Sequence, residues 1–263
     1  MQIDQEAVNE SMWRTMLTGE NPYLHRYRRL YSRLPAEPRC QWCLLPYGGL
    51  GGLLVRKLLH RVPSTLNPRF CNTCEMFAAR YPGGAEVHIT MLFTDIRGST
   101  TIAENLAPME FTRILNRFYA AAANVLIPTH AWIDKLVGDE VIALFIPAFV
   151  GHDHARVAVE TAQSLMRTLG YGTPEGPWLP AGVGIHTDNV FVGTVGSEGI
   201  TDITALGDGM NTTARLVSNA GAGEILISQA TYEAAKLDAA SLDERHLQLK
   251  GRTEPITVRV ITV

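Results

Sequence analysis

An apolar run ends in the stretch Phe93-Thr94-Asp95-Ile96-Arg97-Gly98-Ser99-Thr100. The run before Asp95 alternates in the manner of a mostly buried strand. A second apolar run ends in Lys135-Leu136-Val137-Gly138-Asp139-Glu140, again with an aspartate beside a glycine. Two such carboxylates, if brought together, form a site for hard divalent cations, and glycine-rich backbone beside such ions indicates a nucleoside triphosphate.

The segments around the two stretches have recognisable patterns. Residues 86–95 are predicted to form a strand. The helix that follows is predicted to begin near Thr101, which forms a capping-box pattern with Glu104, and Pro108 suits a first helical turn. Two strand-like runs joined by a tight turn at Gly138 come next.

The rest of this part of the chain continues the alternation of helices and strands. It predicts a helix over 154–169, strands over 181–186 and 190–193 about a turn at 187–189, a helix capped by Asp208, a strand over 225–228, a short helix and a closing segment from 247. The order strand, helix, hairpin, helix and strand predicts an α+β fold. We expect a ferredoxin-like βαββαβ sheet with helices packed mainly on one face.

Composition divides the chain into modules. Of its 263 residues, 46% are hydrophobic and 19% charged, as in ordinary globular proteins. Residues 1–80 carry 11 Lys and Arg against 6 Asp and Glu, whereas the remainder is acidic. We predict a helical arm over 1–38, a four-cysteine module over 39–82 and a larger domain over 83–263. The polar N-terminus has no signal-peptide pattern, so a cytoplasmic protein is expected.

The N-terminal arm combines an interrupted apolar stripe with several arginines. A solvated helix face covering a partner helix is the favoured interpretation. A basic surface for anionic lipid or nucleic acid is the alternative; membrane contact is possible but not favoured, and no nucleic-acid partner is expected.

All four cysteines lie in the basic part of the chain, as the pairs Cys40/Cys43 and Cys71/Cys74. Two CxxC pairs in a reducing compartment indicate a tetrahedral thiolate site. Zinc is the favoured occupant, with an iron–sulfur cluster or redox-active thiols as alternatives. Zinc would stabilise the fold of the module, whereas a cluster would make it a redox sensor.

Residues 87–263 resemble the catalytic domain of class III nucleotidyl cyclases. The resemblance rests on the two stretches quoted above, on the ten residues from Gly207 to Leu216, and on Leu249-Lys250-Gly251, all in the family's order. It implies that Asp95, Asp139 and the Ile96 carbonyl hold two Mg²⁺ or Mn²⁺ ions. Gly98 and Ser99 would offer backbone N–H groups to phosphate.

The resemblance also assigns a second set of residues. Asn211 and Arg215, four apart on one helix face, would orient the ribose and stabilise the transition-state phosphate. Lys250 would contact the terminal phosphates. Lys135 matches the lysine that recognises adenine, and Thr204 stands where many adenylyl cyclases have aspartate, so ATP is the expected substrate.

In this family the two sets come from different subunits, and this chain carries both. A homodimer with two equivalent sites is therefore expected. The expected reaction converts ATP to cyclic AMP and pyrophosphate. The alternatives are a guanylyl cyclase and a catalytically silent nucleotide-binding protein; a diguanylate cyclase is disfavoured because the Asn211/Arg215 pair matches the other family.

Overall fold

The computed structural model describes residues 4–34, 37–197, 200–238, 242–248 and 255–263. They belong to two compact units, one of Met1–Val87 with Phe191–Ala205, and one of His88–Val190 with Leu206–Val263. The division into three parts at residues 38 and 82 stays a prediction. None of the helices in the described ranges is long and apolar enough to cross a membrane.

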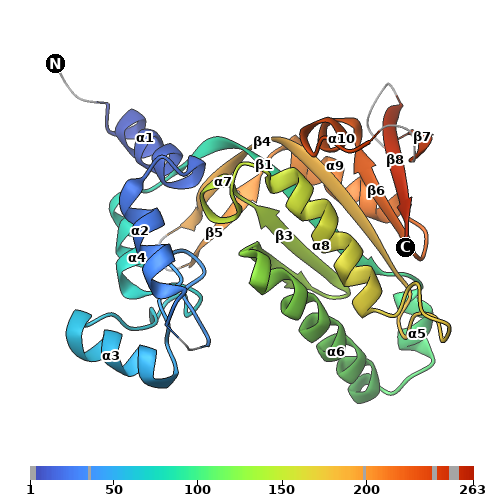
Figure 1. Cartoon of the computed structure of the whole chain (residues 1–263), viewed down its shortest axis with the longest axis horizontal. Coiled ribbons are helices and arrows are strands. Elements are labelled where there is room, and N and C mark those ends of the chain that lie inside the picture. Colours follow the sequence, from blue (N-terminus) through green and yellow to red (C-terminus); the bar gives the residue numbers. More distant parts are fainter. Residues whose placement is uncertain (1–3, 35–36, 198–199, 239–241, 249–254) are drawn as a thin grey trace. The chain divides into compact units, whose positions relative to one another are not determined.

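One mixed sheet provides the framework (Figure 1). Its strands lie in the order β2-β3-β1-β4-β6-β8-β7, and β5 pairs with β4. The β4/β6 pair is parallel, while the β1/β3, β2/β3, β6/β8 and β7/β8 pairs are antiparallel. The strands are β1 (Gly84–Ile96), β2 (Trp132–Val137), β3 (Glu140–Phe145), β4 (Ala181–Ser197), β5 (Ile200–Leu206), β6 (Glu224–Ser228), β7 (Asp243–Leu247) and β8 (Ile256–Thr262).

Most of the helices of the second unit cover one face of this sheet. Alternate β4 residues Val183 and Ile185 join the main core there, beneath α6 (Pro108–Leu126), α8 (His154–Thr168) and α10 (Gln229–Ala234). Figure 1 shows α6 and α8 side by side on this face. The predicted α+β fold, with helices mainly on one face, is confirmed.

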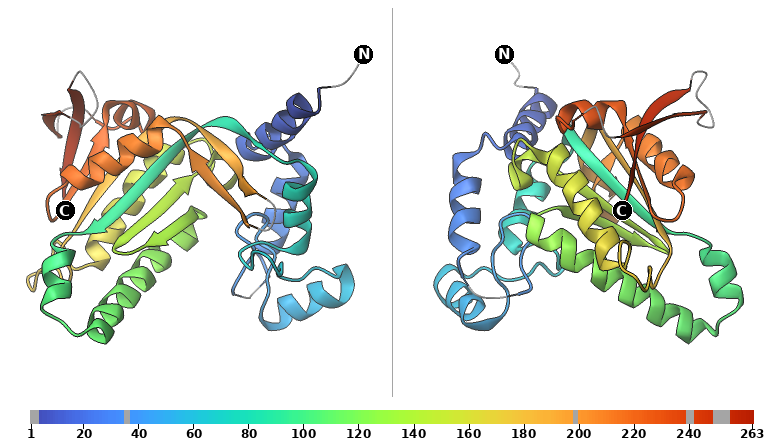
Figure 2. Two further views of the ribbon diagram at one scale, coloured as in Figure 1. Left: turned by 180° about the vertical axis from the view of Figure 1, so that it is seen from behind. Right: turned by 45° about the vertical axis from the view of Figure 1, so that its right-hand side comes forward.

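Helix α9 (Asp208–Asn219) lies on the opposite face, which the view from behind in Figure 2 shows. The helix packs directly against the backbone of β4. A Cβ added at Gly184 would come within 2.4 Å of the Val217 nitrogen, and a Cβ added at Gly182 would come within 3.0 Å of the Ala220 Cβ. These glycines alternate with the core residues of the same strand. The sequence of β4 thus provides side chains to one face and close backbone approach to the other.

The turn predicted at residues 187–189 is wrong, since β4 continues through it to Ser197. Asp188 and Asn189 are residues that favour turns. The backbone nevertheless stays extended, and the Thr187 hydroxyl is buried within hydrogen-bonding distance of Thr90, 2.8 Å away, and Thr231, 3.1 Å away. Tertiary contacts therefore outweigh the local preference.

The first helix after β1 begins earlier than predicted. Helix α5 (Ser99–Glu104) follows Gly98, whose φ of +70° is the left-handed conformation that glycine adopts without strain. Pro108 does open α6, and Glu110 there accepts a hydrogen bond from the Ala107 nitrogen at 3.3 Å. The short elements η1 (Ile127–Thr129) and α7 (Pro147–Val150) complete this unit.

The first unit contains α1 (Gln5–Thr18), α2 (Pro22–Tyr31), α3 (Gly49–Leu59) and α4 (Asn72–Arg80). The predicted N-terminal helix is broken at Gly19, whose φ is +89°, and Asn21 caps α2. Aromatic rings form the small core of this unit, where the ring centroids of Trp13, Trp42 and Phe77 lie within 5.5 Å of one another in tilted and edge-to-face arrangements. Helix α4 begins at the second cysteine pair, with Cys71 at its N-cap position.

Candidate active site and four-cysteine site

The sheet brings Asp95 and Asp139 together. Asp95 is the penultimate residue of β1 and pairs with Glu140 of β3, next to Asp139. The Ile96 nitrogen donates to the Asp139 carbonyl at 3.3 Å. Gly138 has a φ of +59°, which permits the tight β2–β3 turn that carries Asp139. Antiparallel register thus juxtaposes carboxylates 44 positions apart in the sequence.

The two carboxyl groups influence each other's protonation. Burial raises the pKa of Asp95 to about 7, and a hydrogen bond shared with Asp139 adds to this effect, although the Arg97 guanidinium pairs with Asp95 and opposes it. Burial also disfavours ionisation of Asp139, but hydrogen bonds from Ser99 and Asp95 outweigh it and lower the Asp139 pKa. Two close carboxylates that share a proton are poised to bind a cation instead.

The donor set fits a hard divalent ion. The Asp95 Oδ1 atom is buried and has no hydrogen-bond partner among the described residues. The Asp139 carboxylate interacts with Asp95 and offers further oxygen ligands, and the Ile96 carbonyl stays the additional ligand that the family resemblance predicts. Oxygen-rich sites of this kind suit Mg²⁺ or Mn²⁺.

Gly98 and Ser99 lie directly beyond this carboxylate pair. A Cβ built on Gly98 meets nothing within 4 Å, so the backbone beside Asp95 is open. The Ser99 side chain interacts with Asp139. The predicted phosphate-binding turn therefore lies next to the predicted metal ligands.

Tyr119 is a residue that the sequence interpretation missed. It lies on α6, and its hydroxyl donates to the Gly138 carbonyl, in the turn that holds Asp139. The sequence offers no signal for this contact, because Tyr119 lies on a helix 19 residues before the turn. We infer that Tyr119 positions the turn.

We expect Tyr119→Phe to raise the Mn²⁺ concentration needed for half-maximal activity by about fivefold, because one hydrogen bond contributes about 1 kcal/mol. Nucleotide turnover measured over a series of Mn²⁺ concentrations tests this. Tyr232→Phe, on α10, is the matched control and should leave the metal dependence unchanged. An unaltered metal dependence in Tyr119→Phe would show that the hydroxyl has no positioning role.

The predicted base-recognition residues lie on different strands. Lys135 is on β2, where its Nζ lies 3.1 Å from Asp134 Oδ2, and Asp134 is buried at a register shift between β2 and β3. Thr204 is buried on β5, in the first unit. Lys250 lies outside the described residues.

Asn211 and Arg215 are on the side of α9 that faces away from the sheet. Thr212, Leu216 and Val217 of the same helix are buried, whereas Asn211 is exposed and Arg215 half-buried. Neither side chain has a hydrogen bond or ion pair within the described parts of the chain. Their polar ends are therefore available to a ligand.

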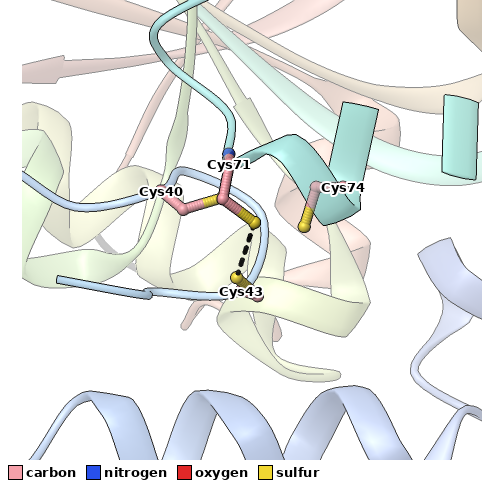
Figure 3. Close-up of side chains that lie close together, drawn as sticks. All are labelled: Cys40, Cys43, Cys71 and Cys74. Carbon is pink, nitrogen blue, oxygen red and sulfur yellow. Dashed lines mark hydrogen bonds between the residues drawn. The ribbon is translucent and has the colours of Figure 1, made fainter. Parts of the chain in front are cut away.

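The four cysteines converge in the first unit, as Figure 3 shows. Their sulfur atoms lie within 4.8 Å of one another, and Cys43 and Cys71 are 3.7 Å apart. Zinc with four thiolates at about 2.3 Å requires sulfur–sulfur separations of about 3.8 Å. The Cys71 nitrogen also donates to Cys40 Sγ at 3.3 Å, an interaction typical of bound thiolates. The arrangement fits a single tetrahedral ion.

A buried arginine lies beside this cluster. Arg28 of α2 is 6% exposed and donates to the carbonyls of Gln41 and Trp42, between the first two cysteines. Burial lowers the pKa of Arg28 to about 10, and the charge of Cys43 and Cys40 opposes that effect. Its positive charge therefore complements an anionic thiolate cluster.

Comparison with known proteins agrees with this geometry. A family model described as the adenylate and guanylate cyclase catalytic domain matches residues 84–262. An adenylate cyclase of Anabaena cylindrica is 29% identical over 179 residues, which are 65% of this chain and 36% of that protein. The terminal-differentiation specific adenylate cyclase of Dictyostelium discoideum is 32% identical over 65% of this chain and 8% of its own length. The chain thus spans about a third or less of these curated relatives.

Solved structures include both kinds of cyclase. The guanylyl cyclase Cya2 has a TM-score of 0.62 and 32% identity, covering 68% of this chain and 93% of its own. The adenylyl cyclase CyaB from P. aeruginosa has a TM-score of 0.59 and 30% identity, covering 68% and 95%. The fold is thus that of a nucleotidyl cyclase catalytic domain. The chain belongs to the class III adenylate and guanylate cyclase family, which confirms the predicted resemblance.

Proposed function

We propose that the protein is an adenylyl cyclase that converts ATP to 3′,5′-cyclic AMP and pyrophosphate. The observation that carries the proposal is the pairing of Asp95 with Asp139 in a chain that also presents Asn211 and Arg215. A catalytically silent relative would be expected to lack one of these groups, and here each has a chemically competent side chain.

In this reaction the ribose 3′-oxygen attacks the α-phosphorus of the same nucleotide, and the bond to pyrophosphate breaks. Divalent ions held by Asp95, Asp139 and the Ile96 carbonyl would lower the pKa of the 3′-hydroxyl and neutralise phosphate charge. Arg215 would place a fixed, planar positive charge on the phosphate as it becomes trigonal bipyramidal. Asn211 would orient the ribose, while Gly98, Ser99 and Lys250 would bind phosphate oxygens.

The active site is proposed to lie between two copies of the chain. Asn211 and Arg215 point away from their own sheet and have no partner in the described part of the molecule, so they are free to contact a second chain. Because each chain supplies both sets of residues, a symmetric dimer would hold two equivalent sites.

Adenine recognition is assigned to Lys135 and Thr204. Threonine replaces the aspartate of many adenylyl cyclases, but its hydroxyl oxygen can still accept a hydrogen bond from the adenine amino group. A guanylyl cyclase usually has glutamate at the position of Lys135. The similarity to both a guanylyl and an adenylyl cyclase structure makes GTP the competing substrate.

We expect ATP to be turned over at least tenfold faster than GTP at equal low concentration. We expect Lys135→Ala to lower kcat/KM for ATP by about 10- to 100-fold, because a hydrogen bond from a charged donor is lost. Initial rates with each nucleotide and Mn²⁺ test this, and Lys57→Ala, a surface lysine of the first unit, is the control. Faster turnover of GTP would assign the protein to the guanylyl cyclases. Absence of any cyclic nucleotide under both oxidising and reducing conditions would exclude an enzyme.

Zinc is the proposed occupant of the four-cysteine site. In an iron–sulfur cluster the cysteines bind different iron atoms, which would hold their sulfurs farther apart than the convergent set seen here. Thiolate ligation and a supply of ATP both point to a cytoplasmic location. Metal analysis with an absorption spectrum of the purified protein distinguishes colourless zinc from iron.

A further inference from the structure

Helix α3 exposes an unusual amount of apolar surface. Leu50, Leu53, Leu54 and Leu58, here called the α3 leucine patch, are between 51% and 81% exposed. Their spacing places them along one side of the helix, while Gly51, Gly52 and Val55 form its buried side. Figures 1 and 2 show that no other described element of the first unit lies along the outer side of α3. A contiguous patch of this kind indicates a docking surface.

The chain around the α3 leucine patch is strongly basic. Residues 20–75 contain nine Lys and Arg against the three acidic residues Glu20, Glu37 and Glu75, although Arg28 is buried and Arg69 pairs with Asp202. Arg56 and Lys57 lie on α3 itself and are exposed. Arg61, just beyond the helix, lies 5.2 Å from the Tyr27 ring and donates to the Tyr31 hydroxyl at 3.2 Å. These contacts bring the arginine-rich helix α2 next to the end of α3.

Charge decides which partner suits this surface. A second copy of the same module would bring positive groups against positive groups, which is unfavourable. An anionic phospholipid surface complements the lysine and arginine side chains, while the leucines enter the boundary between headgroups and acyl chains. Helix α3 has 11 residues and a length of about 16 Å, which suits a helix lying in the interface.

We propose that the α3 leucine patch, with its surrounding basic residues, docks the protein on an anionic phospholipid surface. The apolar side chains provide burial, and the charged side chains provide attraction and orientation. This proposal concerns location alone and holds whichever nucleotide the catalytic domain uses.

The test is sedimentation of the full chain with phosphatidylcholine vesicles, with or without about 30 mol% phosphatidylserine. We expect binding to the anionic vesicles and little to the neutral ones, and weaker binding as NaCl is raised from about 0.05 to 0.5 M. The pair Leu54→Gln/Leu58→Gln should weaken binding by about tenfold or more, since glutamine preserves helix propensity but removes the buried apolar surface. The pair Arg56→Gln/Lys57→Gln should also weaken binding by about tenfold.

Met109→Gln is the matched control, because Met109 is 69% exposed on α6 of the other unit and its replacement should leave binding unchanged. The metal-to-protein ratio of each variant, unchanged from wild type, verifies that the first unit is folded. Failure of the wild-type chain to bind anionic vesicles would overturn the proposal. So would equal binding of the leucine variant, or a loss of self-association by that variant in size-exclusion chromatography without any effect on vesicle binding.

Discussion

Asp95→Ala and Arg215→Ala chains, each inactive alone, are expected to regain activity when they are mixed. Each substitution should lower turnover by about 10³-fold, because a metal ligand or the transition-state charge is lost. In a mixed dimer one site receives both defects and the other receives none. About half of the sites in mixed dimers should work, and about a quarter of all sites after random exchange of equal amounts. Cyclic nucleotide formation after co-refolding or prolonged incubation measures the recovery.

A mixture of Asp95→Ala with Asp139→Ala provides the control. Both substitutions fall in the same half-site, so each site of their mixed dimer keeps one defect and no recovery is expected. No recovery in the Asp95/Arg215 mixture, with mixed dimers shown by differential tagging, would mean that each chain completes its own site. High activity of the Asp95→Ala chain alone would remove Asp95 from the metal ligands.

Removal of the metal from the four-cysteine site is expected to unfold the first unit. Structural zinc contributes about 10–16 kcal/mol of apparent binding free energy, whereas whole domains are stable by about 5–15 kcal/mol. The core around the site is small and consists largely of the ring cluster of Trp13, Trp42 and Phe77. Loss of near-ultraviolet circular dichroism from these rings should accompany chelation, and Cys71→Ser should produce the same loss in the absence of a chelator.

Restoring zinc provides the control. The chelated wild-type protein should regain its circular dichroism when zinc is added back, whereas the Cys71→Ser variant should not. Unchanged dichroism after complete zinc removal would show that the aromatic core is stable without the metal. A visible absorption band together with iron in the metal analysis would replace zinc as the occupant.

The sequence was most informative where chemistry and local pattern coincide. The strand before Asp95, the β2–β3 hairpin around Gly138 and the helices over 108–126 and 154–168 have clear periodicity, and their order led to the correct fold. The convergence of Asp95 with Asp139 was predicted only through the family resemblance, because the hairpin fixes the β2/β3 register but not the β1/β3 pairing that brings the two residues together. The roles of these residues and of the second set stay predictions.

Other features depend on contacts between distant segments, which a single sequence does not reveal. The prediction of a turn at Asp188 was wrong because the buried Thr187 hydroxyl makes contacts that hold the strand extended. Helix α3 was not predicted because its sequence lacks the usual pattern of an apolar buried side and a polar exposed side. Its buried side includes glycines, and its exposed side carries leucines. Tyr119 was not predicted because its hydrogen-bond partner is a backbone carbonyl, and every residue has one, so the sequence does not indicate the contact.

The absence of a side chain at Gly184 has a consequence for Arg215. Elsewhere helices rest on a layer of side chains, whose rotamers can adjust and let a helix shift by fractions of an ångström. Beneath α9 the Val217 backbone meets the strand itself, so that adjustable layer is missing at this point. The height of α9 above the sheet is therefore fixed by main-chain geometry. The backbone that carries Arg215 shares this constraint, so the base of its side chain stays at a nearly constant distance from the sheet.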